Sequence, residues 1–174
     1  MSFTSESINF VQTPNPNAMK SFTLTTEIKI YAISELSETE LLLVKEAQKA
    51  TLRSYAPYSH FKVGAAVLLQ NGTVVTGTNQ ENAAYPSGLC AERTTLFYAN
   101  SQYPSQAVTM LAIASRKENG ELNKIPITPC GACRQVMVET EKRYGKPIRL
   151  LFCGSEEVHI AENAQSLLPL SFDL

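Results

Sequence analysis

Three cysteines in two short clusters are the residues best suited to hold a metal ion. The first cluster is Cys90-Ala91-Glu92-Arg93. The second begins 40 positions after Cys90, with Cys130 in the segment Pro129-Cys130-Gly131-Ala132-Cys133. A C-x-x-C pair alone could be redox-active, structural or accidental. Thiolate ligands favour zinc, and a catalytic zinc site uses three protein ligands where a structural site is closed by four. The spacing therefore predicts an open zinc site with Cys90, Cys130 and Cys133 as its ligands.

The other candidate ligands fit this site less well. Cys153 follows an apolar run over 148–152, which is typical of a small buried side chain. His60 and His159 have no partner at ligand spacing, so we expect packing or surface roles for them. A fourth ligand from Cys153 would instead indicate a structural zinc module, and a reversible Cys130–Cys133 disulfide would indicate a redox module.

Polar side chains beside the cysteines could complete a hydrolytic site. Glu92 stands two residues after a predicted ligand, where it could move a proton from an activated water to a leaving group. Its alternative role is a favourable charge in the first turn of a helix. Three thiolates leave the site anionic, so we expect Arg93 and Gln135 to donate hydrogen bonds to the sulfurs. A solvated charge and a surface amide are their alternatives.

C-x-E followed by P-C-x-x-C is the pattern of the zinc deaminases, with cysteine replacing the more familiar histidine at the first ligand. Further motifs resemble those of the small cytidine deaminases, in the same order, from about Ser37 to the end of the chain. They are YSHFKVGAA at 58–66, GTNQENAAYP at 77–86, CAERT at 90–94, PCGACRQV at 129–136, and LLP at 167–169 with Phe172.

The resemblance implies an enzyme of pyrimidine salvage that converts cytidine, and 2′-deoxycytidine, to uridine or 2′-deoxyuridine and ammonia. It implies one Zn²⁺ per chain, bound by the three cysteines, with Glu92 as acid and base. It also implies a homotetramer, or a dimer, whose active sites combine residues of more than one subunit. The implied substrate contacts are Phe61 on the pyrimidine ring, Asn79 and Glu81 on the ribose hydroxyls, Ala91, and Tyr85 and Phe172 reaching a neighbouring subunit's site.

Three features depart from the family pattern. Gln80 stands where the family usually has an aliphatic residue, so packing beside the sugar could differ. Residues 1–36 have no counterpart in the short members, and the chain stops soon after Phe172. We therefore divide the chain into an N-terminal extension, 1–36, and a catalytic domain, 37–174.

Hydrophobic periodicity predicts the elements that position these residues. A capping box at 37–40 precedes a helical pattern that ends by Pro57, and an Asn71-Gly72 turn joins two strands as a hairpin. Residues 1–20, with Pro14 to Asn17, are predicted to be an arm or loop. The expected strands are 21–31, 63–69, 73–77, 107–114 and 148–152, and the further helices are 90–100, 132–144 and 164–168. This order predicts an α/β fold, a three-layer α/β/α sandwich around one mixed sheet. The resemblance implies that this sheet is mostly five-stranded.

Composition argues against several classes of protein. The 174 residues suit one domain, and a net charge of −1 with a pI near 6.1 supplies no basic stripe for nucleic acid. The N-terminus lacks the pattern of a secretory signal, and no apolar run approaches the roughly 20 residues of a membrane span, so a cytoplasmic protein is expected. Deamination of another nucleoside-like amine, or of a base in nucleic acid, stays open as the alternative.

Overall fold

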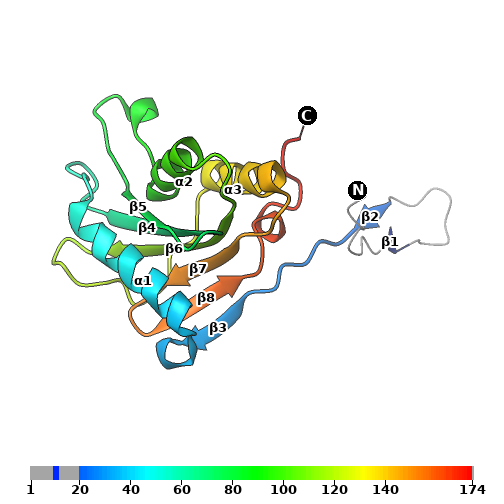
Figure 1. Ribbon diagram of the computed structural model, residues 1–174, viewed down its shortest axis with the longest axis horizontal. Helices are drawn as coiled ribbons and strands as arrows, with labels where there is room; N and C mark the ends of the chain where they lie inside the picture. The colour runs from blue at the N-terminus through cyan, green and yellow to red at the C-terminus, as the bar shows by residue number, and fades with distance from the viewer. Residues whose placement is uncertain (1–9, 12–19, 174) are drawn as a thin grey trace.

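The computed structural model describes residues 10–11 and 20–173, and its core is a six-stranded mixed sheet between two helical layers (Figure 1). The strand order is β3-β8-β7-β6-β4-β5, and all neighbours are antiparallel except β6 and β7. The strands are β3 (Lys29–Ala32), β4 (Lys62–Leu69), β5 (Val74–Thr78), β6 (Val108–Arg116), β7 (Arg149–Cys153) and β8 (Glu157–Ala161). The helices are α1 (Glu38–Ala50), α2 (Ala91–Gln102) and α3 (Gly131–Tyr144).

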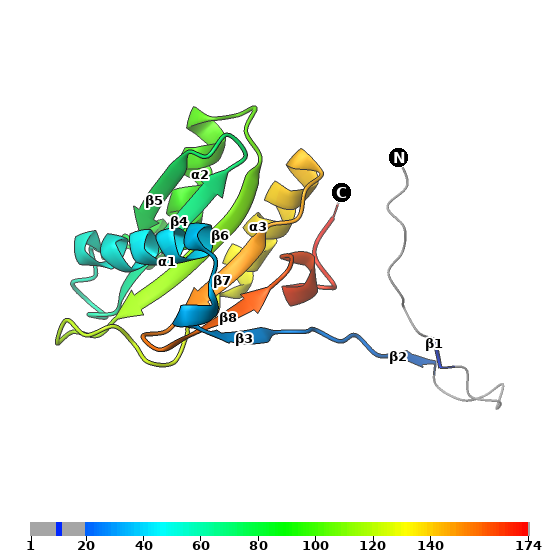
Figure 2. The same ribbon diagram turned by 60° about the horizontal axis from the view of Figure 1, so that its bottom comes forward.

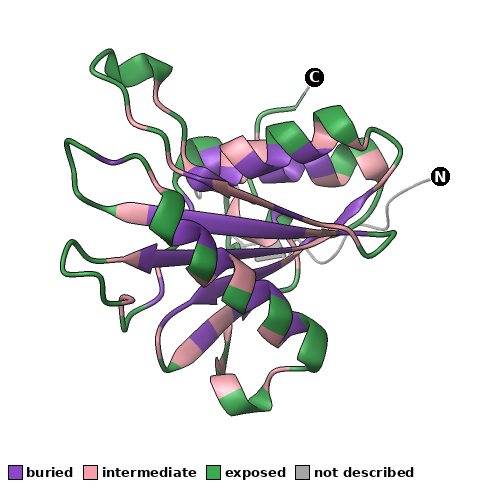
Figure 3. Cartoon of the chain, turned by 60° about the vertical axis from the view of Figure 1, so that its left-hand side comes forward, coloured by how far each residue is buried: buried purple, intermediate pink, exposed green. Residues whose placement is uncertain are grey.

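Each face of the sheet has its own hydrophobic core. Helix α1 covers one face, where its Leu43, Val44 and Ala47 pack with residues of β6, β7 and β8. Helices α2 and α3 cover the other face, where Leu96 and Met137 lie in the larger core. Figure 3 shows the sheet and the inner helix surfaces buried and the outer helix surfaces exposed. The predicted three-layer α/β arrangement is confirmed.

Two glycines let the helices approach the sheet closely from opposite sides. A Cβ at Gly64 in β4 would lie 2.4 Å from the carbonyl oxygen of Ala47 in α1, and one at Gly77 in β5 would lie 2.4 Å from Oγ1 of Thr95 in α2. Neither distance is compatible with a side chain. The glycines in the two predicted substrate-site motifs thus fix where α1 and α2 sit.

The helix boundaries follow their sequence signals. Ser37 and Glu40 form the predicted capping box of α1, and the predicted hairpin turn joins β4 to β5 with Gly72 at φ 85°. Cys90 and Cys130 are the N-cap residues of α2 and α3, and α3 ends at Gly145 in the left-handed conformation. The predicted helix over 164–168 is a short 3₁₀ helix, η4 (Gln165–Leu167).

The sheet has six strands where about five were expected, and the additional strand is β8. Strand β8 was not predicted, because only Val158 and Ile160 alternate in its five residues. The predicted strand at 21–31 is also shorter than expected. Only Lys29–Ala32 joins the sheet, while β2 (Ser21–Phe22) pairs separately with β1 (Phe10–Val11). The loop predicted around Pro14 to Asn17 lies outside the described residues.

Strand β3, which lies in the predicted N-terminal extension, joins the sheet of the later residues by pairing with β8 at the edge (Figures 1 and 2). Ahead of β3, the chain runs away from the sheet toward β2 (Figure 2). Oγ1 of Thr26 donates to the carbonyl oxygen of Ser166 in η4 at 2.6 Å. No helix in the described part of the chain has the length and apolar character needed to cross a membrane.

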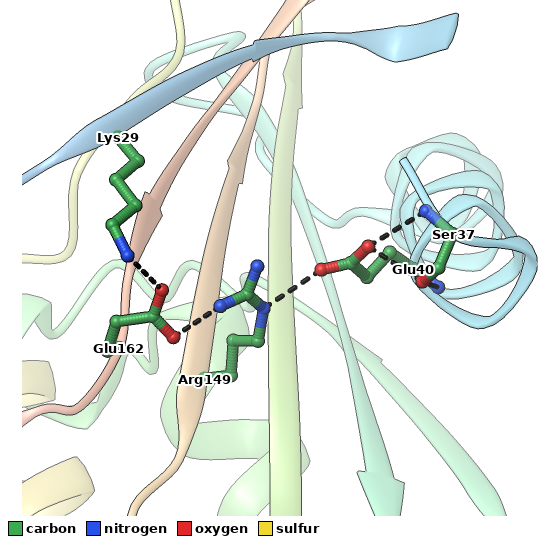
Figure 4. Close-up of polar contacts among 5 residues, drawn as sticks. All are labelled: Lys29, Ser37, Glu40, Arg149 and Glu162. Carbon is green, nitrogen blue, oxygen red and sulfur yellow. Dashed lines mark hydrogen bonds and ion pairs between the residues drawn. The ribbon is translucent and has the colours of Figure 1, made fainter. Parts of the chain in front are cut away.

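A chain of ion pairs links β3 to the loop after β8, to β7 and to the start of α1 (Figure 4). Lys29 contacts Glu162 at 3.1 Å, Arg149 contacts the other oxygen of Glu162, and Nε of Arg149 donates to Glu40 at 2.8 Å. Glu40 in turn accepts from the backbone nitrogen and the hydroxyl of Ser37. Arg149 therefore joins the start of α1 to the loop after β8.

Replacing Arg149 by methionine is expected to lower the free energy of unfolding by about 2 kcal/mol, because it removes hydrogen bonds to two carboxylates. Burial alone would raise the pKa of Glu40, but the bonds from Ser37 and Arg149 outweigh it and lower that pKa. The bonds from Arg149 and Lys29 lower the pKa of Glu162. Both folded pKa values thus lie below the ordinary 4.5, so the network stabilises the fold above that pH and loses its effect as pH falls through the folded values.

Urea unfolding at pH 7 and at roughly pH 3 checks this prediction, since the difference between the two proteins should shrink at the lower pH. Lys124→Met is the matched control, because it removes an ion pair on the surface. The side chain of Lys124 is 75% exposed and that of its partner, Glu156, is 72% exposed. That variant should lose less than about 0.5 kcal/mol. An Arg149→Met effect of the same size at both pH values would contradict the assigned role of the carboxylates.

Candidate zinc centre and substrate pocket

The fold brings the two cysteine clusters together because α2 and α3 pack on the same face of the sheet and begin at the same end (Figure 1). The Sγ atom of Cys90 lies 3.8 Å from that of Cys130, and the Sγ atoms of Cys130 and Cys133 are 3.5 Å apart. All three sulfurs lie within 4.8 Å of one another. Among the described residues they form the only group of three potential metal ligands.

This geometry fits a zinc ion. Tetrahedral zinc with Zn–S distances of about 2.3 Å places its sulfurs about 3.8 Å apart. Cys153 lies in the core on the α1 side of the sheet, where its thiol faces the carbonyl oxygen of Leu151. His159 contacts Glu157 and His60 faces Glu118. Three sulfurs, with no fourth side chain from the described residues, suit an open site.

Hydrogen bonds around the cluster favour negative charge on Cys90. Bonds from the Cys133 thiol and from Nη2 of Arg93, 3.7 Å away, lower the pKa of Cys90 to about 5. The same contact with Cys90, followed by burial, raises the pKa of Cys133. Without a metal, the cluster thus favours a thiolate at Cys90 and a thiol at Cys133. Binding of a cation would displace the proton of the thiol. Arg93 lies where the sequence predicted a donor to sulfur.

Glu92 is the second residue of α2 and is only 5% exposed. Burial raises the pKa of its carboxyl, and the charge on Cys90 adds to this effect. A carboxyl in such surroundings, beside a predicted metal ligand, is typical of proton-transfer groups.

A pocket of about 480 Å³ opens beside Cys90 and Arg93. Its lining includes Asn79, Glu81 and Tyr85, so three of the predicted substrate contacts meet a predicted metal ligand there. Gln80, which departs from the family pattern, also lines it, and its amide donates to Oγ1 of Thr78 and to the carbonyl oxygen of Asn79.

The remaining predicted contacts lie outside this lining. Ala91 is fully buried at the start of α2. Phe61 is partly exposed in the loop before β4, and Phe172 is 68% exposed near the C-terminus. Tyr85, 79% exposed, lies in the short 3₁₀ helix η3 (Tyr85–Ser87), and its ring meets that of Tyr58 edge-on at 6.5 Å.

Asn79 and Glu81 also hold the loop that carries Phe61. The Asn79 amide accepts from the backbone nitrogen of Val63 at 2.8 Å and donates to the carbonyl oxygen of Phe61 at 2.9 Å. Glu81 accepts from the backbone nitrogens of Tyr58 and Ser59 and from the Ser59 hydroxyl. These bonds, led by the Ser59 hydroxyl, lower the pKa of Glu81 and keep it ionised.

Sequence reasoning missed Tyr58 and Ser59, which both line the pocket. The available signal was their place two and three residues before Phe61 in the YSHF motif. Gln135 was expected to donate to sulfur. Its Nε2 instead donates to the carbonyl oxygen of Phe172 and its Oε1 accepts from the Phe172 nitrogen, both at 3.0 Å.

Comparison with known proteins finds similarity across the region that contains the cysteines and Glu92. Residues 37–144 match the family model of the cytidine and deoxycytidylate deaminase zinc-binding region. A cytidine deaminase of Halalkalibacterium halodurans is 47% identical over 98 residues, which are 56% of this chain and 69% of the relative. One of Sporosarcina psychrophila is 44% identical over 97 residues, which are 56% of this chain and 66% of the relative.

The fold is likewise similar to solved structures. The crystal structure of a cytidine deaminase from Burkholderia pseudomallei superposes with a TM-score of 0.65 at 35% identity, covering 79% of this chain and 100% of that one. That of the Mycobacterium tuberculosis enzyme has a TM-score of 0.58 at 33% identity, covering 76% and 96%. These similarities confirm the resemblance drawn from the motifs, and zinc is the metal that this domain binds.

Proposed function

Because the chain belongs to the cytidine and deoxycytidylate deaminase family, we propose that it hydrolyses cytidine and 2′-deoxycytidine to uridine or 2′-deoxyuridine and ammonia, in pyrimidine salvage. The observation that carries the proposal is the position of the three cysteine sulfurs beside a pocket lined by Asn79 and Glu81. We assign one zinc ion per chain to Cys90, Cys130 and Cys133.

Zinc, when bound, supplies the Lewis acidity that makes water a nucleophile near neutral pH. Glu92 takes a proton from the water and passes it to the ring nitrogen as the oxygen adds to C4. It then moves the remaining proton of the added hydroxyl group to the amino group, so that the C4 carbonyl forms, the C4–N bond breaks and ammonia leaves. Arg93 donates to the Cys90 sulfur and reduces the negative charge that three thiolates bring.

The pocket suits a free nucleoside. Glu81 is ionised and exposed to the pocket, which makes it an acceptor for ribose hydroxyls, and Asn79 stands beside it. Phe61 would pack on the pyrimidine ring, with Ala91 beside it at the start of α2. The side chains of Tyr85 and Phe172 are largely exposed, so both are available to a neighbouring subunit's site in the homotetramer that we propose, with a dimer as the alternative. We place the enzyme in the cytoplasm.

Ultraviolet absorbance of cytidine, followed with zinc-quantified full-length protein, tests this proposal. We expect conversion to uridine that rises in proportion to zinc content, up to about one ion per chain. Parallel assays with deoxycytidine monophosphate and with a labelled oligonucleotide separate a free nucleoside from a nucleotide or polymer substrate. Zinc-loaded protein that leaves cytidine unchanged would overturn the assignment.

Replacing Glu81 by glutamine is expected to raise KM for cytidine by about tenfold to a hundredfold, because hydrogen bonds to an ionised acceptor contribute about 1.5–3 kcal/mol. The zinc content should stay unchanged, since Glu81 contacts no cysteine. Initial rates over a range of cytidine concentrations measure this, with Glu38→Gln, an exposed residue of α1, as the control. An unchanged KM would remove Glu81 from the substrate contacts.

A further inference from the structure

Arg134 holds the backbone on both sides of a predicted zinc ligand. It lies in the first turn of α3, directly after Cys133, and its Nε donates to the carbonyl oxygen of Pro129 at 2.9 Å. Its backbone nitrogen donates to the carbonyl oxygen of Cys130 at 3.0 Å. The second bond is the first main-chain bond of α3, which most residues at this position would make, so the side chain of Arg134 adds the bond to the carbonyl group just before Cys130.

Burial of Pro129 and packing of Ile127 anchor the loop before Cys130, but the residues of the loop next to the sulfur contribute little themselves. Pro129 has no N–H to donate. Cys130 is the N-cap of α3 but its side chain makes no capping hydrogen bond, because the sulfur faces Cys90 and Cys133 instead. Gly131, which follows, has open space where a Cβ would be. The position of the Cys130 sulfur therefore depends on backbone contacts, and the side chain of Arg134 makes one of them.

The other end of the guanidinium is attached to a second segment. Nη1 of Arg134 donates to the carbonyl oxygen of Leu167 in η4 at 3.1 Å. Leu167 packs against the core under α2 and α3. The chain before it is held by Glu141, which accepts from the backbone nitrogens of Ala164 and Gln165. Arg134 thus fastens the ligand loop to a segment that is itself anchored.

We propose that Arg134 is a positioning residue for the zinc site, which ties the loop carrying Cys130 to the C-terminal segment and thereby increases zinc affinity. The planar guanidinium is suited to this because it directs two N–H groups at two carbonyls from one rigid group. The inference concerns zinc retention. Its consequence for turnover rests on the proposed function.

Zinc affinity of full-length Arg134→Met, measured by competition with a chromogenic chelator, tests the inference. We expect affinity to fall about tenfold to a hundredfold, the usual effect of losing a group that orients a metal ligand. Arg143→Met is the matched control, since Arg143 lies on the same helix and stacks on Tyr144 at 5.2 Å. It should leave zinc affinity within about twofold of the unchanged protein.

Arg134→Lys keeps the positive charge. This variant tests the same inference if Arg134→Met does not fold. A single ammonium replaces the fork that reaches both carbonyls, so we expect a zinc affinity about threefold to tenfold below that of the unchanged protein. In Co²⁺-substituted protein, the thiolate charge-transfer band should shift in the Arg134 variants and not in Arg143→Met. Unchanged zinc affinity in a folded Arg134 variant overturns the inference, whether or not cytidine is the substrate.

Discussion

Replacing Glu92 by glutamine is expected to lower kcat for cytidine by about 10⁴-fold, with zinc and folding retained. An amide fills the same space but cannot accept and return a proton, and general acid–base catalysis contributes about 10²–10⁴-fold. The fold should tolerate the change because Glu92 is buried in surroundings that already raise its pKa, so a neutral side chain suits them.

Three measurements on the same preparation check this prediction: zinc per chain, thermal unfolding and the absorbance assay. Glu139→Gln is the control, because Glu139 is exposed on α3 and the substitution is the same. Near-native turnover by Glu92→Gln would remove Glu92 from the proton transfer. A loss of turnover that accompanied a loss of zinc would assign Glu92 to the integrity of the site instead.

The sequence was most informative where a feature is local. The capping box at Ser37, the Asn71-Gly72 hairpin and the helix starts at Cys90 and Cys130 are each determined within a few residues, and the structure has them all. The meeting of the three sulfurs was expected from the C-x-E and P-C-x-x-C motifs. The structure achieves it by packing both helices on one face of the sheet.

Features that depend on distant partners could not be predicted in the same way. Strand β8 has only Val158 and Ile160 as an alternating pair, and its pairing with both β7 and β3 is a property of the sheet. Arg134 is similar: its spacing from Cys133 was visible, but its acceptor at Leu167 lies 33 positions away. Gln135 was predicted to donate to sulfur because it lies close to Cys133 in the sequence. Its amide instead bonds the backbone of Phe172, which lies far away in the sequence.

Replacing Cys133 and Cys153 one at a time tests how many cysteine ligands hold the zinc ion. Cys133→Ala is expected to reduce zinc from about one ion per chain to below about 0.1, because two remaining thiolates leave the tetrahedral site short of a ligand. Turnover of cytidine should fall at least about 10³-fold with it. Cys133 is fully buried in the core under α2 and α3, so thermal unfolding of the variant measures the packing that is lost together with the ligand.

Cys153→Ala should behave in the opposite way. Its sulfur lies in the α1-side core, on the other face of the sheet, where burial raises the pKa of the thiol to about 12 and keeps it protonated. Removing it leaves a small cavity that costs about 1 kcal/mol in unfolding free energy, with zinc and turnover unchanged. Zinc analysis and thermal unfolding of both variants make the comparison. Loss of zinc from Cys153→Ala would mean a site closed by four ligands, with no position left for water to react.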